Sequence, residues 1–172
     1  IIPLAENTDK LLNSLSYVSE TLDRVKQNLS KETTLLGFAG APFTVASYMI
    51  EGGSSAKGEF FECKKFMFTD SLAFHKLMDL ITNATIAYLK MQIHAGAEVV
   101  QLFESWSGAL SPDQYNEFCL PYTKKIVDEI KKFAPVIHYL GQGAALIPEA
   151  LKINPNVHSV DWRQNLSFVS ET

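Results

Sequence analysis

Short β-prone runs alternate with long helical patterns along the whole of this 172-residue sequence. The runs cover residues 33–40, 98–103, 135–139 and 157–161, and they are bordered by small or polar residues. Short strands separated by long helices are typical of a parallel sheet with crossover helices. The alternation therefore predicts an α/β fold.

The helices are recognised by apolar residues that recur every three or four positions. Pro42 suits the first turn of a helix, and Ser111, Pro112 and Gln114 together have the pattern of a capping box at a helix start. The predicted helices cover residues 7–29, 42–50, 58–68, 70–94, 111–133 and 144–152. Residues 33–40 are expected to form a buried strand that ends in a tight turn.

Both a doubly wound sheet and a (β/α)8 barrel produce this order of elements. Four strands are only half of such a barrel, which typically needs about 250 residues. We therefore expect a partial (β/α)8 TIM barrel, with about half of the barrel present, in which residues 1–172 form a single partial domain. Half a barrel leaves two unpaired sheet edges and the sequence begins at Ile1, so we expect it to be the central part of a longer protein.

The charge balance and the cysteines exclude several classes of protein. There are 15 Lys and Arg against 19 Asp and Glu, and no basic stripe that would neutralise phosphates, so nucleic acid is not an expected partner. No window reaches the roughly 18 apolar residues of a membrane helix. Cys63 and Cys119 are too few and too far apart for a disulfide framework or a zinc knuckle. We expect a soluble, cytoplasmic protein.

Polar residues that follow the strands are the first candidates for a functional site. In parallel α/β folds the carboxyl ends of the strands, with the loops after them, form the active face. By this rule the candidates are residues 40–53, 104–108 and 138–142, together with Asp161 and Arg163. We expect these four loops to converge on one mouth.

Each candidate also has a purely structural interpretation. Tyr48 is more often a core residue with a bonded hydroxyl, and residues 52–55 are better explained as a helix terminus than as a phosphate cradle. Glu104 and Asp161 are either paired acids or acceptors of neighbouring backbone amides, and the sequence favours neither. His138 supplies at most one metal ligand from its segment, so a hydrogen-bonded core or rim histidine is the better interpretation and no metal site is predicted.

Several short motifs resemble one known family. Residues 37–44 read GFAGAPFT and residues 48–55 read YMIEGGSS. They closely resemble the GF[AS]G[AS]PWT and YMVEGGSS segments of the uroporphyrinogen decarboxylase family, with Phe43 in place of the usual Trp. Further similar segments follow in the same order, namely AGA at 95–97, LFESWSG at 102–108, LPY at 120–122 and DW at 161–162.

The resemblance implies a distorted (β/α)8 barrel, usually a homodimer. Members decarboxylate the four acetate side chains of uroporphyrinogen III to give coproporphyrinogen III in heme and porphyrin biosynthesis, without a metal or organic cofactor. By motif, Tyr48 and Ser105 correspond to the family's substrate-binding tyrosine and serine or threonine. The family's arginine-rich loop, pyrrole-binding aspartate and C-terminal histidine have no counterpart here, so no catalytic residue is assigned within this chain.

The required chemistry agrees with that gap. An octa-anionic substrate needs several cations, and arginine grips carboxylates best. The chain has two arginines, Arg24 and Arg163, of which only Arg163 is near the predicted mouth. Two alternatives stay open: a non-catalytic tetrapyrrole-binding or dimerisation module, and, less favoured, a corrinoid-dependent methyltransferase of the same superfamily. The zinc motif His-x-Cys of those methyltransferases is not matched, because Leu140 stands two residues after His138.

Overall fold

The strands form one parallel sheet, seen in a computed structural model that describes residues 8–53 and 59–167. They are β1 (Leu36–Gly40), β2 (Val99–Glu104), β3 (Val136–Leu140) and β4 (Val157–Val160). Their order in the sheet is β1-β2-β3-β4. A barrel adds its strands one after another in this way, whereas a doubly wound sheet reverses direction at a switch point. The prediction of a partial barrel is confirmed.

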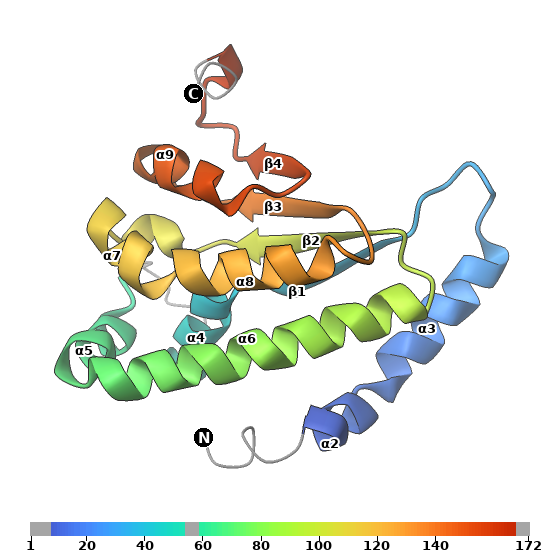
Figure 1. The fold of residues 1–172 in the computed structure, drawn as a ribbon, viewed down its shortest axis with the longest axis horizontal. Coiled ribbons are helices and arrows are strands. Elements are labelled where there is room, and N and C mark those ends of the chain that lie inside the picture. The colour runs from blue at the N-terminus through green and yellow to red at the C-terminus, as the bar shows by residue number, and fades with distance from the viewer. Residues whose placement is uncertain (1–7, 54–58, 168–172) are drawn as a thin grey trace.

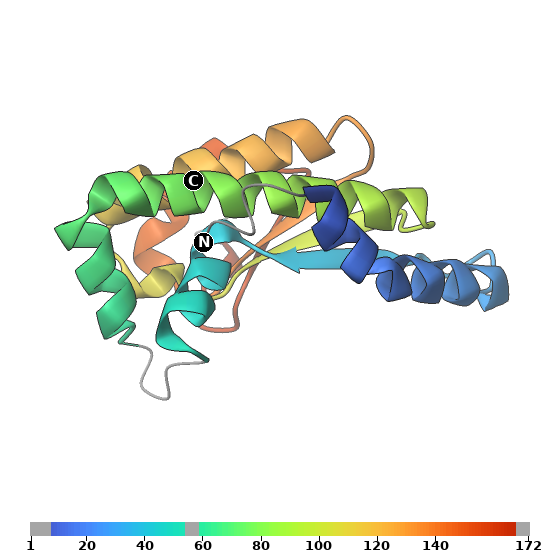
Figure 2. The same cartoon turned by 90° about the horizontal axis from the view of Figure 1, so that it is seen from below.

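Helices precede the first strand and connect the successive strands, and two of the connecting helices cover one face of the sheet. They are α2 (Thr8–Ser14), α3 (Ser16–Asn28), α4 (Pro42–Glu51), α5 (Phe61–Thr69), α6 (Ser71–His94), α7 (Pro112–Phe118), α8 (Leu120–Ile130) and α9 (Ile147–Ala150). Short 3-10 helices cover Ser107–Ala109, Ala144–Leu146 and Leu151–Ile153. Figures 1 and 2 show α6 and α8 side by side on the same face of the strands, while α4, α5 and α7 gather at the end to which the strands point.

Two helices predicted as continuous are each divided into two. The pattern over residues 7–29 breaks at Leu15, between α2 and α3, with no Pro or Gly to account for the break. The helix predicted over 111–133 breaks at Cys119, whose φ and ψ are −121° and −57°. Pro121 lies two residues later and has no N–H to donate to the preceding turn, so a regular helix cannot run through it. The apolar stripe continues across both breaks, which is why the periodicity does not reveal them.

The local start and stop signals are confirmed. The N–H of Gln114 donates to Ser111 Oγ at 3.3 Å, and the N–H of Ser111 donates to Gln114 Oε1 at 3.0 Å, which completes the predicted capping box. Pro42 begins α4, and Gly52 ends it in the left-handed conformation with φ of 74°. Glycine adopts this conformation without steric cost. The remaining residues of the suggested phosphate cradle, 54 and 55, lie outside the described residues.

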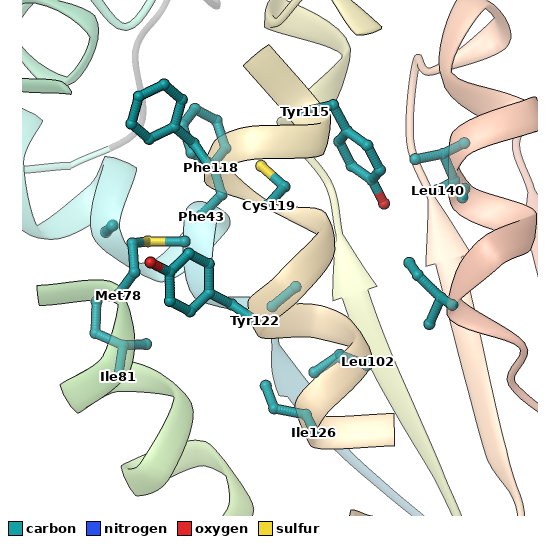
Figure 3. Packing of buried hydrophobic residues seen from close by; sticks show 14 of the residues in the cluster. Phe43, Met78, Ile81, Leu102, Tyr115, Phe118, Cys119, Tyr122, Ile126 and Leu140 are labelled. Carbon is teal, nitrogen blue, oxygen red and sulfur yellow. The ribbon is translucent and has the colours of Figure 1, made fainter. Parts of the chain in front are cut away.

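The hydrophobic core fills the space between the sheet and the helices on it. Figure 3 shows side chains of α7 and α8 facing those of α6 and β2, among them Met78, Ile81, Leu102, Phe118, Cys119, Tyr122 and Ile126, all of which are buried. The other face of the sheet is more open. On β1, Leu36 is 39% exposed and Phe38 is 59% exposed. The prediction that β1 is a buried strand is therefore wrong, because only its alternate residues Gly37 and Ala39 face the helices.

The free edge of β1 is partly closed by Gln92 from α6. Along a strand, the backbone groups of successive residues point alternately to its two sides. The N–H of Ala41 donates to the carbonyl of Phe103 on β2, so the backbone groups of Phe38, three residues earlier, point to the free edge. Gln92 Oε1 accepts the N–H of Phe38 and Gln92 Nε2 donates to its carbonyl, both at 2.9 Å. A Cβ at Gly37 would lie 2.8 Å from Gln92 Oε1, so the glycine leaves room for this contact.

Candidate functional site

Hydrogen bonds connect the loops that follow the strands. The N–H of Ser105, after β2, donates to Thr44 Oγ1 on α4 at 3.1 Å. The N–H of Gln142, after β3, donates to Asp161 Oδ2, after β4, at 2.6 Å. Parallel strands place their carboxyl ends at one edge of the sheet, and these contacts bring the loops together there. We call this region, formed by residues 40–53, 105–108, 141–143 and 161–163, the mouth.

Two glycines allow the loops after β2 and β3 to touch. A Cβ at Gly108 would lie only 2.4 Å from the carbonyl oxygen of Gln142. A Cβ at Gly141 would lie 3.0 Å from the carbonyl oxygen of Ser105. The N–H of Gly141 also donates to the carbonyl of Glu104 at 3.0 Å. A side chain at Gly108 would force the two backbones apart, so these loops meet only because glycine stands there.

Tyr48 belongs to a cluster of three aromatic rings at the mouth. It lies in the last turn of α4, and its hydroxyl accepts a hydrogen bond of 2.7 Å from Trp106 Nε1. The two rings are perpendicular, with centroids 6.3 Å apart. The ring of Phe60, which is fully buried, lies 5.1 Å from Trp106. Tyr48 is 38% exposed, so its interpretation as a core residue is wrong, although its hydroxyl is bonded as that interpretation expects.

Ser105 is held close to the same aromatic cluster. Thr44 and Tyr48 are four residues apart on α4, so they lie on one face of that helix. Thr44 accepts the N–H of Ser105, and Tyr48 accepts the indole N–H of the next residue, Trp106. The structure therefore brings Tyr48 and Ser105 together through two hydrogen bonds to the same helix face. Ser105 itself is half-buried.

The carboxylate of Asp161 accepts hydrogen bonds from backbone amides. The N–H of Arg163 donates to it at 2.8 Å, the N–H of Gln142 at 2.6 Å, and Arg163 Nη1 at 3.1 Å. The Arg163 N–H, with that of Gln142 and the guanidinium, holds the pKa of Asp161 below its ordinary value. The guanidinium also lies 4.8 Å from the ring centre of Trp162. Of the two interpretations of Asp161, hydrogen bonding to the backbone is correct.

Glu104 turns away from the mouth and is fully buried. Its Oε2 accepts the hydroxyl proton of Thr123 on α8 at 2.7 Å, and its Oε1 has no partner within the described part of the chain. Neither interpretation of this side chain is correct, because its carboxylate bonds a side-chain hydroxyl rather than another acid or a backbone amide. In β2, buried and half-buried residues alternate, and Glu104 falls on the buried, helix-covered side.

His138 is also fully buried on that side of the sheet, with its Nε2 4.0 Å from Glu104 Oε2. Neither ring nitrogen has a hydrogen-bond partner among the residues described, so the prediction of a hydrogen-bonded histidine is wrong. Its neighbour in register on β4 is His158, whose ring lies perpendicular at 5.7 Å. Burial, and secondarily His138, lowers the pKa of His158 to about 4.

His75, His94 and Cys119 lie outside the mouth, while the Sγ of Cys63 lies 3.7 Å from Ser47 Oγ on α4. His75 Nδ1 is hydrogen-bonded to the Tyr122 hydroxyl at 2.6 Å, and His94 Nδ1 donates to the carbonyl of Lys90. Cys63 and Cys119 are free thiols in the core. Across residues 8–53 and 59–167, no three His, Cys, Asp or Glu side chains gather as a metal site would require. Over the same residues, no helix has both the length and the apolar character needed to cross a membrane.

The mouth can act chemically through hydrogen-bond donors for an anionic ligand. Tyr48 is 38% exposed there, Ser105 is half-buried, and the side chain of Arg163 is 50% exposed. The sequence did not single out Thr44 or Trp106, although they position these groups. Both residues lie in segments that the strand-end rule selects, 40–53 and 104–108, but the contacts that they make join segments far apart in the chain and leave no local sequence signal.

Comparison with known proteins places the chain among relatives. The family model for uroporphyrinogen decarboxylase (URO-D) matches residues 3–171. The uroporphyrinogen decarboxylase of Desulfotalea psychrophila is 41% identical over 167 residues, which are 96% of this chain and 46% of the relative. That of Thermodesulfovibrio yellowstonii is 47% identical over 137 residues, 80% of this chain and 40% of the relative. The chain thus spans a little under half the length of these curated relatives.

A solved structure shares the fold. A methyltransferase from Methanosarcina mazei superposes with a TM-score of 0.76 over 90% of this chain and 44% of its own length, at 18% sequence identity. The likeness concerns the arrangement of strands and helices alone. Since the family model spans almost all of the sequence, the chain belongs to the uroporphyrinogen decarboxylase family.

Proposed function

We propose that this chain forms the central half of a uroporphyrinogen decarboxylase. In that enzyme the mouth binds uroporphyrinogen III, and each of the four acetate side chains loses its carboxylate as CO2 and becomes a methyl group, without a cofactor, to give coproporphyrinogen III. The proposal is supported most by Tyr48 and Ser105, to which the motif resemblance assigns substrate binding: Tyr48 lies on α4, and the N–H of Ser105 donates to Thr44 on the same helix. The family match over residues 3–171 supports it.

The chemistry assigns binding and orientation to this chain. When the C–C bond to a carboxylate breaks, its electron pair stays on the methylene carbon, and a pyrrole that has first been protonated can accept that pair. The methylene carbon then takes up a proton and the pyrrole ring releases the proton that it had gained, so that overall one proton replaces CO2. Tyr48 and Ser105 donate hydrogen bonds to the anionic substrate, while Arg163 contributes a cation that it shares with Asp161. The other half of the enzyme supplies the proton donor, the pyrrole-binding carboxylate and most of the cations. We infer that the whole enzyme is a cytoplasmic homodimer.

A hybrid enzyme tests the proposal. Its parent is the 41% identical relative, in which the 167-residue matching segment is exchanged for this chain. We expect the hybrid to form coproporphyrinogen, measured by chromatography of the oxidised porphyrins. Loss of a hydrogen bond to a charged group costs about 1.5–3 kcal/mol, so Tyr48→Phe and Ser105→Ala should each lower kcat/KM by about 10- to 100-fold.

Matched controls separate the site from general effects. Tyr17→Phe and Ser19→Ala remove the same hydroxyls from the exposed surface of α3, and they should leave kcat/KM unchanged. A folded hybrid that binds the tetrapyrrole without turnover would refute the decarboxylase proposal and favour the non-catalytic alternative. Parental rates in both Tyr48→Phe and Ser105→Ala would refute the site assignment.

A further inference from the structure

The hydrogen bond between Trp106 and Tyr48 has a direction that its chemistry fixes. An indole nitrogen only donates, so the Tyr48 oxygen is the acceptor of the 2.7 Å bond. A phenol carries one proton, and that proton remains available for donation. Within the described residues no second hydrogen bond of the Tyr48 hydroxyl is recorded. Since Tyr48 is 38% exposed at the mouth, its proton can reach a ligand there.

Trp106 is fixed from its backbone and from its ring. The residue before it, Ser105, donates its N–H to Thr44, and the carbonyl of Trp106 accepts the N–H of Ala109 at 3.1 Å. The ring packs on Phe60 at a centroid distance of 5.1 Å. Phe60 has φ of 47° and ψ of 51°, a left-handed conformation that is unfavourable for a residue with a side chain. The surrounding structure holds Phe60 in this conformation, and with it the ring that packs against Trp106.

We infer that Trp106 is a positioning residue that fixes the Tyr48 hydroxyl as a hydrogen-bond donor to a carboxylate of the bound tetrapyrrole. With the indole N–H on one lone pair, the phenol oxygen directs its proton to the ligand. An acetate or propionate oxygen accepts such a proton, whereas a pyrrole N–H cannot. The identity of the ligand rests on the proposed function, but the direction of the hydrogen bond does not.

The hydrogen bond is tested on the 172-residue chain without any ligand. The sequence has two tryptophans, so the nitrogen-15-labelled chain gives two indole N–H signals in its NMR spectrum. Trp106→Phe identifies the signal of Trp106, and Trp162, which is 85% exposed, is the internal control. In Tyr48→Phe the Trp106 signal should shift and its hydrogen exchange should accelerate by about tenfold, while the Trp162 signal stays unchanged. An unchanged Trp106 signal would overturn the inference.

The effect on the ligand is tested by kinetics of the hybrid enzyme. Trp106→Phe keeps an aromatic ring without the N–H and should lower kcat/KM by about tenfold. In a Tyr48→Phe background the same substitution should change kcat/KM by less than about twofold, because the hydroxyl on which it acts is gone. Trp106→His retains an N–H donor and should recover most of the lost activity.

The outcomes distinguish this inference from the proposed function. An equal loss from Trp106→Phe with and without the Tyr48 hydroxyl indicates a merely structural role and overturns the inference. A failed rescue by Trp106→His together with an unshifted indole signal does the same. If the indole signal shifts as expected but Tyr48→Phe has parental kcat/KM, the hydrogen bond stands and the assignment of Tyr48 to the substrate is refuted.

Discussion

Replacing Gln92 with Leu measures how strongly α6 stabilises the free edge of the sheet. Gln92 is 2% exposed, and its amide makes two 2.9 Å hydrogen bonds with the backbone of Phe38. Leucine has a similar size, so the packing is largely retained while both hydrogen bonds are lost. Each such bond contributes about 1 kcal/mol, and an unpaired backbone group adds a penalty where water does not reach it. We expect the free energy of unfolding to fall by about 2–4 kcal/mol.

Urea and thermal denaturation followed by circular dichroism give this quantity. In a chain of this size 1 kcal/mol corresponds to about 2–4 °C in Tm, so a decrease of about 5–15 °C is expected. Gln27→Leu is the matched control, since Gln27 donates to Asp23 on the exposed face of α3, where such a pair contributes about 0.2–0.5 kcal/mol. Gly37→Ala should disturb the same contact and add little to Gln92→Leu. Equal losses from Gln92→Leu and Gln27→Leu would refute the reasoning.

Three further predictions concern packing, protonation and reactivity. Gly108→Ala places a methyl group 2.4 Å from the Gln142 carbonyl oxygen, which is backbone, so in urea denaturation it should cost more stability than Gly40→Ala, whose methyl group meets the end of the Val45 side chain at 3.0 Å. Equal costs would contradict this. Burial lowers the pKa of His158 to about 4, so the folded chain binds the imidazole proton more weakly than the unfolded chain does. The free energy of unfolding should therefore decrease as the pH falls from 6.5 toward 4. His158→Gln should flatten that decrease, and a curve parallel to that of the unmodified chain would count against it. Burial raises the pKa of Cys63 to about 11, so iodoacetamide should label it at about pH 8 only when the chain unfolds; rapid labelling of the folded chain would disprove this.

Most of the fold could be predicted because it depends on local patterns. Apolar periodicity located the helices and strands, and the residues around Ser111 and Gly52 marked helix ends correctly. The break at Cys119 could not be predicted from periodicity, because Pro121 interrupts the helical hydrogen bonds of the backbone while the apolar stripe continues. The exposure of Phe38 depends on which face of β1 the helices cover, and no local pattern carries that information.

The loops that form the site could be predicted from the sequence, but the contacts between their side chains could not. Strand ends indicated where Tyr48 and Ser105 would meet, but the bond between Tyr48 and Trp106 joins residues far apart in sequence. Among the residues that the structure describes, the ring of His138 has no hydrogen-bond partner, and its neighbours in the strand register are Leu102 and His158. Such pairings are decided by tertiary packing, which a single sequence does not encode in any short window.

The sequential order of the sheet also determines when its parts can assemble. Each inner strand pairs only with the strands immediately before and after it in the chain, so no pairing must wait for a distant segment. The pair β3 and β4 is separated by short helical turns and has the smallest loop to close, whereas β1 and β2 must first enclose α4, α5 and α6. During synthesis from the N-terminus, β2, β3 and β4 can therefore each pair with a strand that has already been made.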